Sequence, residues 1–520
     1  MKHIVTPSNT PARKHWKAGL LAAAACALIG VASLPLSGIA QPGGAVPTPQ
    51  AAPAAAASAP AAPATPAAIA VTSVPPSTPA LSPTVAAFST MAPPRTTTPA
   101  ADAQVVRGEY LARAGDCISC HTRAGGVPFA GGLSMSTPFG AIVSTNITPD
   151  KSQGIGNYTQ ADFTQALREG KSKDGRHLYP AMPYTNFSKL GDEDLSALYV
   201  YFMKGVKPAT QDNAKTDLPW PFSMRWLMAG WNLLYLPGKP FASETSQSAE
   251  WNRGAYLVQG LGHCGACHTP RSVTGAEKAA THADGELFLS GAVIDGWYAQ
   301  PLRNSTAPGL GTWSEAELVT YLKTGRTEKT AAFGAMRDVI TNSTQHLSDA
   351  DLKSVAVYLK SLNGKDGGTA PVTPAPAGGA SGGAVAAALQ KGDVGRIGSL
   401  VYLNNCNACH RSDGQGAQKT FPTLAQNSVV NAKDPTSLIR LVLEGSVMPQ
   451  TQQAPSPIGM PGFGWRLTDA NVADVLTLVR SSWGNTGAAV TPQQVAAVRK
   501  ATATDAPSAQ ANMAKPWTGK

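Results

Sequence analysis

Three stretches of the chain share one helical spacing of apolar residues. In each, apolar side chains recur at i, i+3, i+4 and i+7, which places them on one face of a helix. An acidic or hydroxyl residue opens each stretch, as helix N-termini prefer: Asp192, Ser348 and Thr468. The apolar sets are Leu195, Leu198, Tyr199 and Phe202; Leu352, Val355, Ala356 and Leu359; and Val472, Val475, Leu476 and Val479. The pattern predicts three equivalent helices.

A second repeated pattern lies upstream of each predicted helix. Residues 107–111 read Arg-Gly-Glu-Tyr-Leu, residues 253–257 read Arg-Gly-Ala-Tyr-Leu, and residues 397–401 read Ile-Gly-Ser-Leu-Val as a degenerate third copy. We expect each to begin an N-terminal helix. The two patterns together predict a unit of about a hundred residues, repeated three times, within the usual size of a domain.

The N-terminus has the hydropathy pattern of a secretory signal. Cations precede an uncharged run over residues 19–40 that ends in small residues, so we predict a signal peptide over residues 1–40. The run is long enough to cross a bilayer if it is not cleaved, which leaves an uncleaved anchor as the alternative. Residues 41–103 are rich in Ala, Pro, Thr and Ser without apolar periodicity, and we predict a disordered linker there.

An aromatic-rich stretch separates the first two units. Residues 218–236 contain Trp220, Phe222, Trp226, Trp231 and Tyr235 around a single charge. The apolar part is too short to span a membrane but suits its interface. A buried connector or a docking surface for another subunit is the alternative.

Six of the seven cysteines belong to three copies of Cys-x-x-Cys-His, and the seventh, Cys26, lies in the predicted signal peptide. Two thiols at this spacing can form thioethers to one porphyrin, and the adjacent His then binds the iron. The predicted haem-attachment residues are Cys117, Cys120, Cys264, Cys267, Cys406 and Cys409, and the predicted iron ligands are His121, His268 and His410. The motifs therefore predict three covalently bound haem c groups.

Two other interpretations of these cysteines are weaker. Structural zinc needs four protein ligands, usually from two such pairs, whereas each pair here has a single His behind it. A redox-active Cys-x-x-Cys would not require a His after every copy.

Each haem also needs a sixth iron ligand, and methionine residues stand before each closing helix. Met182 and Met336 occupy that position in the first two units, and Met460 occupies it in the third, where Met448 lies farther from the helix. His177, His282 and His346 compete in the first two units. No histidine follows His410. By repetition we predict Met182, Met336 and Met460, a ligation that raises the haem potential relative to two nitrogens.

The formal net charge of +10 does not indicate a nucleic-acid partner. Four of the cations lie in the predicted signal peptide, and haem propionates would offset most of the remainder.

The three units resemble the class I cytochrome c fold, and the whole chain resembles the triheme cytochrome c subunit of bacterial membrane-bound alcohol, gluconate and sorbitol dehydrogenases. The resemblance covers roughly residues 105–485, and its most specific passages are residues 107–111, 144–149, 342–347 and 460–467. It implies a mainly α protein that carries electrons from a separate catalytic subunit, of quinone-cofactor or flavin type, to membrane ubiquinone. It also implies a place on the periplasmic face of the cytoplasmic membrane.

The expected organisation follows from these patterns. Three tandem class I cytochrome c-like domains span residues 104–208, 249–364 and 393–485. A connector spans residues 209–248, a Gly/Ala/Pro linker residues 365–392, and a C-terminal tail residues 486–520. We expect no catalytic acid, base or nucleophile in this chain. A free-standing periplasmic multihaem carrier is the alternative function, and a haem peroxidase or fused dehydrogenase is disfavoured because all three irons are predicted to be closed by methionine.

Overall fold

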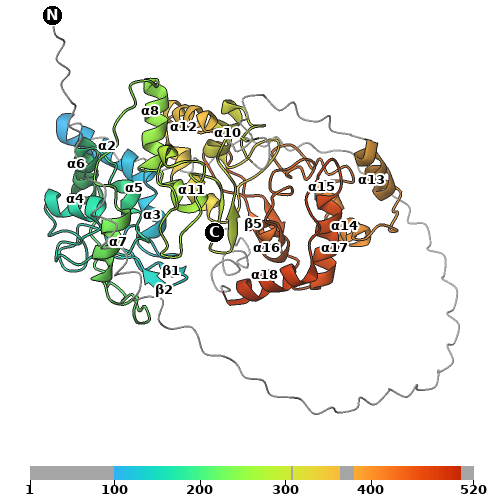
Figure 1. The fold of residues 1–520 in the computed structure, drawn as a ribbon, viewed down its shortest axis with the longest axis horizontal. Helices are drawn as coiled ribbons and strands as arrows, with labels where there is room; N and C mark the ends of the chain where they lie inside the picture. The colour runs from blue at the N-terminus through green and yellow to red at the C-terminus, as the bar shows by residue number, and fades with distance from the viewer. Residues whose placement is uncertain (1–98, 306–308, 364–379, 505–520) are drawn as a thin grey trace, which may run out of the picture. The chain divides into compact units, whose positions relative to one another are not determined.

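The computed structural model of the chain describes residues 99–305, 309–363 and 380–504. These residues are mainly helical, with three antiparallel two-stranded hairpins (Figure 1). The predicted signal peptide and nearly all of the predicted spacer lie outside the described residues. We refer below to residues 99–206, 249–363 and 380–504 as the first, second and third regions.

The first region begins and ends with the two predicted helices. Its helices are α2 (Pro99–Ala114), α3 (Cys117–Cys120), α4 (Gln160–Glu169), α5 (Tyr184–Phe187) and α6 (Asp192–Val200), and its hairpin pairs β1 (Ser134–Thr137) with β2 (Gly140–Val143). The helix predicted from Leu195 to Phe202 is confirmed, although its last turn is the π-helix η1 (Tyr201–Gly205).

The second region repeats this order. It contains α8 (Ala249–Gln259), α9 (Gly265–His268), η2 (His282–Asp284), the hairpin of β3 (Ala292–Ile294) and β4 (Trp297–Ala299), α10 (Glu315–Thr324), α11 (Met336–Asn342), η3 (Thr344–His346) and α12 (Asp349–Ser361). Ser348 caps α12 by accepting a hydrogen bond from the backbone N–H of Asp351, as the sequence predicted.

The third region is larger than the sequence indicated. It contains α13 (Ala380–Gln390), α14 (Ser399–Asn405), α15 (Asn407–His410), α16 (Thr436–Glu444), the hairpin of β5 (Gly445–Val447) and β6 (Gly459–Pro461), α17 (Asp469–Arg480) and α18 (Pro492–Thr504). The boundaries predicted for the linker (365–392) and the tail (486–520) were wrong where α13 and α18 form. Both helices bury apolar side chains in the core of this region, Val385 and Leu389 from α13 and Val495 from α18.

One glycine in each region allows the helix before the haem motif (α2, α8 or α14) and the closing helix (α6, α12 or α17) to approach closely. A Cβ on Gly108 would lie 2.1 Å from the backbone oxygen of Ala197, and one on Gly254 would lie 1.9 Å from that of Ser354. In the third region, the corresponding distance from Gly398 to the oxygen of Asp474 is 2.3 Å. Any larger residue would push the two backbones apart, so the repeated glycine reflects one helix crossing used three times.

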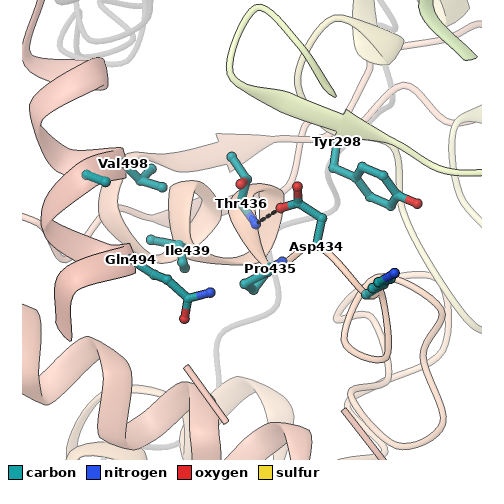
Figure 2. Close-up of a pocket in the computed structure, with 9 residues that line it drawn as sticks. Tyr298, Asp434, Pro435, Thr436, Ile439, Gln494 and Val498 are labelled. Atoms are coloured by element: carbon teal, nitrogen blue, oxygen red, sulfur yellow. Dashed lines mark hydrogen bonds between the residues drawn. The ribbon is translucent and has the colours of Figure 1, made fainter. Parts of the chain in front are cut away.

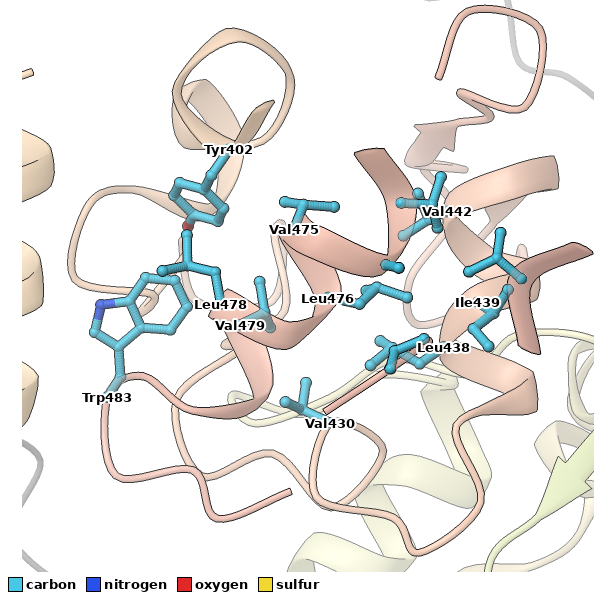
Figure 3. Packing of buried hydrophobic residues seen from close by; sticks show 14 of the residues in the cluster. Tyr402, Val430, Leu438, Ile439, Val442, Val475, Leu476, Leu478, Val479 and Trp483 are labelled. Atoms are coloured by element: carbon cyan, nitrogen blue, oxygen red, sulfur yellow. The ribbon is translucent and has the colours of Figure 1, made fainter. Parts of the chain in front are cut away.

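Three apolar clusters form the cores. Figure 3 shows the third, where Leu476 of α17 lies near Leu438 and Ile439 of α16, and Val475 belongs to the same cluster. The cluster of the first region also contains residues from the second, Leu261, Leu347 and Leu352. The first two regions therefore share part of one apolar core.

The aromatic connector packs on the first region through α7 (Leu227–Tyr235). The buried amide of Asn232 accepts a hydrogen bond from the Tyr184 hydroxyl at 2.8 Å and donates one to the Glu169 carbonyl at 2.9 Å. Arg225 stacks over the ring of Tyr179, 4.3 Å from its centroid. Within the described ranges, no helix is both long and apolar enough to cross a bilayer.

Candidate haem sites

The three Cys-x-x-Cys-His motifs adopt the same turn. In each, the backbone N–H of the histidine donates to the carbonyl of the first cysteine, at 3.0 Å for His121, 3.0 Å for His268 and 2.9 Å for His410. The two cysteines of a motif are three residues apart in a helical turn, so both thiols lie on one side of it. This is the arrangement needed to reach two substituents of one porphyrin.

A backbone carbonyl orients each motif histidine. Nδ1 lies 2.7 Å from the carbonyl oxygen of Thr145 for His121, 2.6 Å from that of Gln300 for His268, and 3.0 Å from that of Pro422 for His410. Burial lowers the pKa of all three histidines. Each ring is therefore neutral with its proton on Nδ1, which leaves the lone pair of Nε2 available for a metal.

The motif thiols do not have the properties of a redox-active pair. Burial raises the pKa of Cys117, Cys264 and Cys406 to about 12, and that of Cys120 and Cys267 to about 11. Reactive dithiols instead have lowered thiol pKa values, which maintain the thiolate. The described cysteines form no disulfide.

Two of the predicted methionine ligands pack in the same apolar cluster as a motif cysteine. Met182 shares the cluster of the first region with Cys117, and Met460 shares the cluster of the third region with Cys406. Met336 is half-buried at the start of α11, just after Phe333, whose ring packs on Trp297. These placements agree with the predicted ligand roles, which stay predictions.

The competing methionine of the third region lies elsewhere. Met448 is buried outside the cluster that contains Cys406 and Met460, and the next residue, Pro449, packs against Gly325 of the second region. Met448 therefore lies where the second and third regions meet and not beside Cys406, which favours Met460 as the ligand.

Of the three competing histidines, two already have partners for their ring nitrogens. His282 pairs with Glu244 at 2.8 Å through Nε2, and His346 approaches the Thr341 carbonyl at 3.2 Å. His177 has a buried Nδ1 without a hydrogen-bond partner, and it is the histidine alternative to Met182. The described residues bring together no group of three or more His, Cys, Asp or Glu side chains that could hold a metal ion.

A shallow groove of about 490 Å³ lies between the second and third regions (Figure 2). Tyr298 of β4 forms one side, the start of α16 forms the floor, and Gln494 and Val498 of α18 form the other side. None of its lining residues belongs to a haem motif or is a predicted iron ligand. The strand that carries Tyr298 leads to Gln300, whose carbonyl orients His268.

Residues that join the first two regions were not assigned a role by the sequence. The hydroxyl of Tyr256 donates to the carboxylate of Asp194 at 2.6 Å, and that of Tyr110 donates to the carboxylate of Asp351 at 2.5 Å. Both tyrosines stand at the same position of the repeated Arg-Gly-x-Tyr-Leu pattern. That shared position indicated a common role for the two tyrosines, but it did not indicate that their partners are Asp194 and Asp351.

Taken together, the motif thiols, the neutral and oriented histidines and the buried surroundings fit covalently attached haem. They define a c-type cytochrome. Residues 105–206 and 396–483 match the cytochrome c family.

Comparison with known proteins specifies the family. The chain is 51% identical over 404 residues to the gluconate 2-dehydrogenase cytochrome c subunit of Pantoea cypripedii, which covers 77% of this chain and 90% of that protein. It is 48% identical over 387 residues to the cytochrome c subunit of alcohol dehydrogenase (quinone) of Gluconobacter oxydans, which covers 74% and 79%. It is 39% identical to the fructose dehydrogenase cytochrome subunit of Gluconobacter japonicus, over 76% of this chain and 82% of that one. The chain belongs to this family of dehydrogenase cytochrome c subunits, which confirms the resemblance found in the sequence.

Proposed function

We propose that this chain is the triheme electron-transfer subunit of a membrane-bound dehydrogenase complex, and that it passes electrons from a separate catalytic subunit to ubiquinone. The observation that carries the proposal is the threefold repetition of one site. In each of the three motifs, a neutral histidine oriented by a backbone carbonyl follows two cysteines of one helical turn. The names of its relatives support the role of a subunit beside a dehydrogenase.

Haem c, when bound, supplies a one-electron iron couple. The motif cysteines would hold the group by thioethers, and the Nε2 atoms of His121, His268 and His410 would bind its iron. Thioether sulfur from Met182, Met336 and Met460 would raise the potential and close the iron to substrate. No group in this arrangement needs to donate or accept a proton, so the oxidation of the substrate belongs to another chain.

The partners follow from the same family. We propose a catalytic subunit of quinone-cofactor or flavin type as the electron donor, a small third subunit, and ubiquinone as the acceptor. Haem attachment to such motifs and the predicted signal peptide support a location on the periplasmic face of the cytoplasmic membrane.

The outer face of α7 supports attachment to the membrane surface. Its exposed residues recur at helical spacing and are all apolar or glycine: Trp226, Ala229, Gly230, Leu233 and Leu234. Leu233 is 86% exposed, whereas the polar Asn232 points inward and is buried. A helix with its polar side chain inside and an apolar stripe outside suits the interface of a bilayer, where tryptophan is favoured.

Retention on membranes tests this face. Replacing Leu233 and Leu234 by Ser should release the holoprotein from membranes into the soluble fraction, because it removes two large exposed apolar side chains of this face. Val106→Ser is the control, since Val106 is also exposed (66%) but lies on α2. Retention equal to that of the control variant would show that α7 does not hold the protein on the membrane.

The proposed function itself is tested by isolation of the native complex. We expect co-purification with a larger dehydrogenase subunit, three haems for each copy of this chain, and reduction of a ubiquinone analogue by substrate. Isolation of the chain alone, with electron exchange limited to soluble proteins, would instead support a free-standing periplasmic carrier.

A further inference from the structure

The first and second regions exchange a pair of equivalent contacts. The hydroxyl of Tyr256 accepts a hydrogen bond from the backbone N–H of Gly191 at 3.3 Å, besides its donation to Asp194. The hydroxyl of Tyr110, from the first region, makes the same two contacts with the second region. It accepts a hydrogen bond from the backbone N–H of Ser348 at 3.2 Å and donates one to Asp351. Each tyrosine therefore binds the first turn of the closing helix of the other region.

The three closing helices differ in how much capping their own sequence supplies. Thr468 opens α17 with a complete capping box, in which its side chain and that of Asn471 each accept a backbone N–H. Ser348 opens α12 with a side-chain cap alone. Gly191 opens α6 and has no side chain to cap it. A first turn without a cap leaves its N–H groups unsatisfied.

The two closing helices without a complete capping box, α6 and α12, each receive a tyrosine from the neighbouring region. Relative to the glycine that permits the helix crossing, the third region has Leu400 where the others have Tyr110 and Tyr256, and Leu400 is 57% exposed. The region with a complete cap thus has no tyrosine from a neighbour, whereas at α6, which has no side-chain cap of its own, the Tyr256 hydroxyl accepts the backbone N–H of Gly191.

The segment that α6 anchors carries the predicted ligand of the first haem. Only eight residues separate Met182 from Gly191, and the second region holds this segment at further points. Asn186 donates to the carbonyl of Gln259 at 3.3 Å, and the buried Lys189 donates to the same oxygen at 3.2 Å and to that of Ala280 at 3.1 Å. Loss of the Tyr256 hydroxyl would therefore remove one of the contacts that hold the end of a segment whose other end carries the predicted ligand Met182.

We propose that Tyr256, although it belongs to the second haem domain, is a positioning residue for the sixth ligand of the first haem. It caps α6 from the neighbouring domain and so holds Met182 against the iron. The inference rests on the proposed haem-binding function and on Met182 as the ligand. It predicts that a side chain of one domain controls the potential of the haem in the other.

The test is the variant Tyr256→Phe in the full-length holoprotein. Phenylalanine keeps the ring that packs edge-on against Phe241, so the domain interface keeps its apolar contact. Loss of a cap changes a helix-end equilibrium about five-fold, so we expect the near-infrared charge-transfer band of methionine-bound ferric haem to weaken. In a redox titration the first haem should move to lower potential, and the other two steps should stay in place.

Two further variants make the outcome specific. Gly191→Ser should restore the band and the potential in the Tyr256→Phe background, because the Cβ at position 191 meets no atom within 4 Å and serine can cap the helix as Ser348 does. Tyr110→Phe should shift the second haem less than Tyr256→Phe shifts the first, since Ser348 still caps α12.

Met182→Leu identifies the step of the first haem and separates the two hypotheses. If Met182→Leu moves a step that Tyr256→Phe does not, the role of Tyr256 is overturned while the ligand assignment stands. A shift of the second haem in Tyr256→Phe, or no rescue by Gly191→Ser, overturns it equally. If Met182→Leu moves no step, the ligand assignment fails instead.

Discussion

The guanidinium of Arg440 on α16 lies over the indole of Trp297 on β4, 4.5 Å from the ring centroid. The same side chain donates to the carbonyl of Asp295 at 2.6 Å and pairs with Glu444 at 2.8 Å. Nearby, the backbone N–H of Tyr298 donates to the hydroxyl of Ser437 at 2.7 Å. These contacts attach the β3–β4 hairpin to the third region. The same hairpin leads to Gln300, whose carbonyl binds Nδ1 of His268.

This attachment predicts the effect of removing Arg440. Arg440→Ala should lower the free energy of unfolding by about 2 kcal/mol, because it removes a stacked cation and leaves a partly buried carbonyl without its donor. Denaturant unfolding measures the change. Arg466→Ala is the control, since Arg466 lies 5.7 Å from the ring of the exposed Trp465. Equal effects of the two variants would contradict a structural role for the Arg440 contact.

A methionine substitution tests the sixth ligand of the third haem. Met460→Leu should lower one of the three reduction potentials, because the iron loses its thioether ligand. Met448→Leu should leave all three in place, since leucine preserves the apolar volume of a residue outside the cluster of Cys406. Potentiometric titration of both variants decides between them, and a shift in Met448→Leu alone would reverse the assignment.

The helix crossings predict intolerance of a single methyl group. Gly254→Ala should destabilise the second region by about 3 kcal/mol or more, because its Cβ would overlap the Ser354 carbonyl and separate α8 from α12. Thermal unfolding measures the loss. Gly383→Ala on α13 is the matched control: its Cβ meets no atom within 4 Å, and alanine in a helix is neutral or slightly stabilising. A tolerated Gly254→Ala would mean that the two helices do not cross this closely.

The contact between the first two regions predicts a dependence on pH. Burial alone would raise the pKa of Asp351, but hydrogen bonds from Arg253 and Tyr110 hold it below its ordinary value of 3.8. Because the folded-state pKa is lowered, the stabilisation is complete above about pH 4 and is lost as the pH falls through the lower folded-state value.

The variant Asp351→Asn tests this dependence. It should cost about 1 to 3 kcal/mol at neutral pH, and the lower part of that range is expected because the Arg253 side chain is 36% exposed and screened by solvent. Unfolding measured from neutral pH down to about pH 3 should decline less steeply in the variant than in the parent protein. Parallel curves would mean that Asp351 does not contribute to the acid sensitivity.

The local features of this protein could be predicted because they depend on neighbours in the chain. The motif turns, the helix caps at Ser348 and Thr468 and the apolar stripes of α6, α12 and α17 each need only a few consecutive residues. The candidate ligands Met182, Met336 and Met460 followed from spacing within the repeat. The linker and the tail were predicted from amino-acid composition, and this prediction was wrong where the alanine-rich α13 and the C-terminal α18 form. These helices are stabilised because Val385, Leu389 and Val495 are buried in a core whose other residues are distant in the sequence.

The sequence by itself identified the family and predicted the haem-attachment motifs and the elements of each repeat, because these are encoded at short range. Tertiary structure alone decided which atoms meet across the repeats. The carbonyl partners of the histidines are backbone groups, to which no side-chain pattern points. The bond from Tyr256 to Asp194 joins residues 62 positions apart, and that from Tyr110 to Asp351 joins residues 241 apart. Such pairs depend on how the two regions pack. The shared position of Tyr110 and Tyr256 in the repeat shows that the two residues are equivalent, but it does not show which residues they contact.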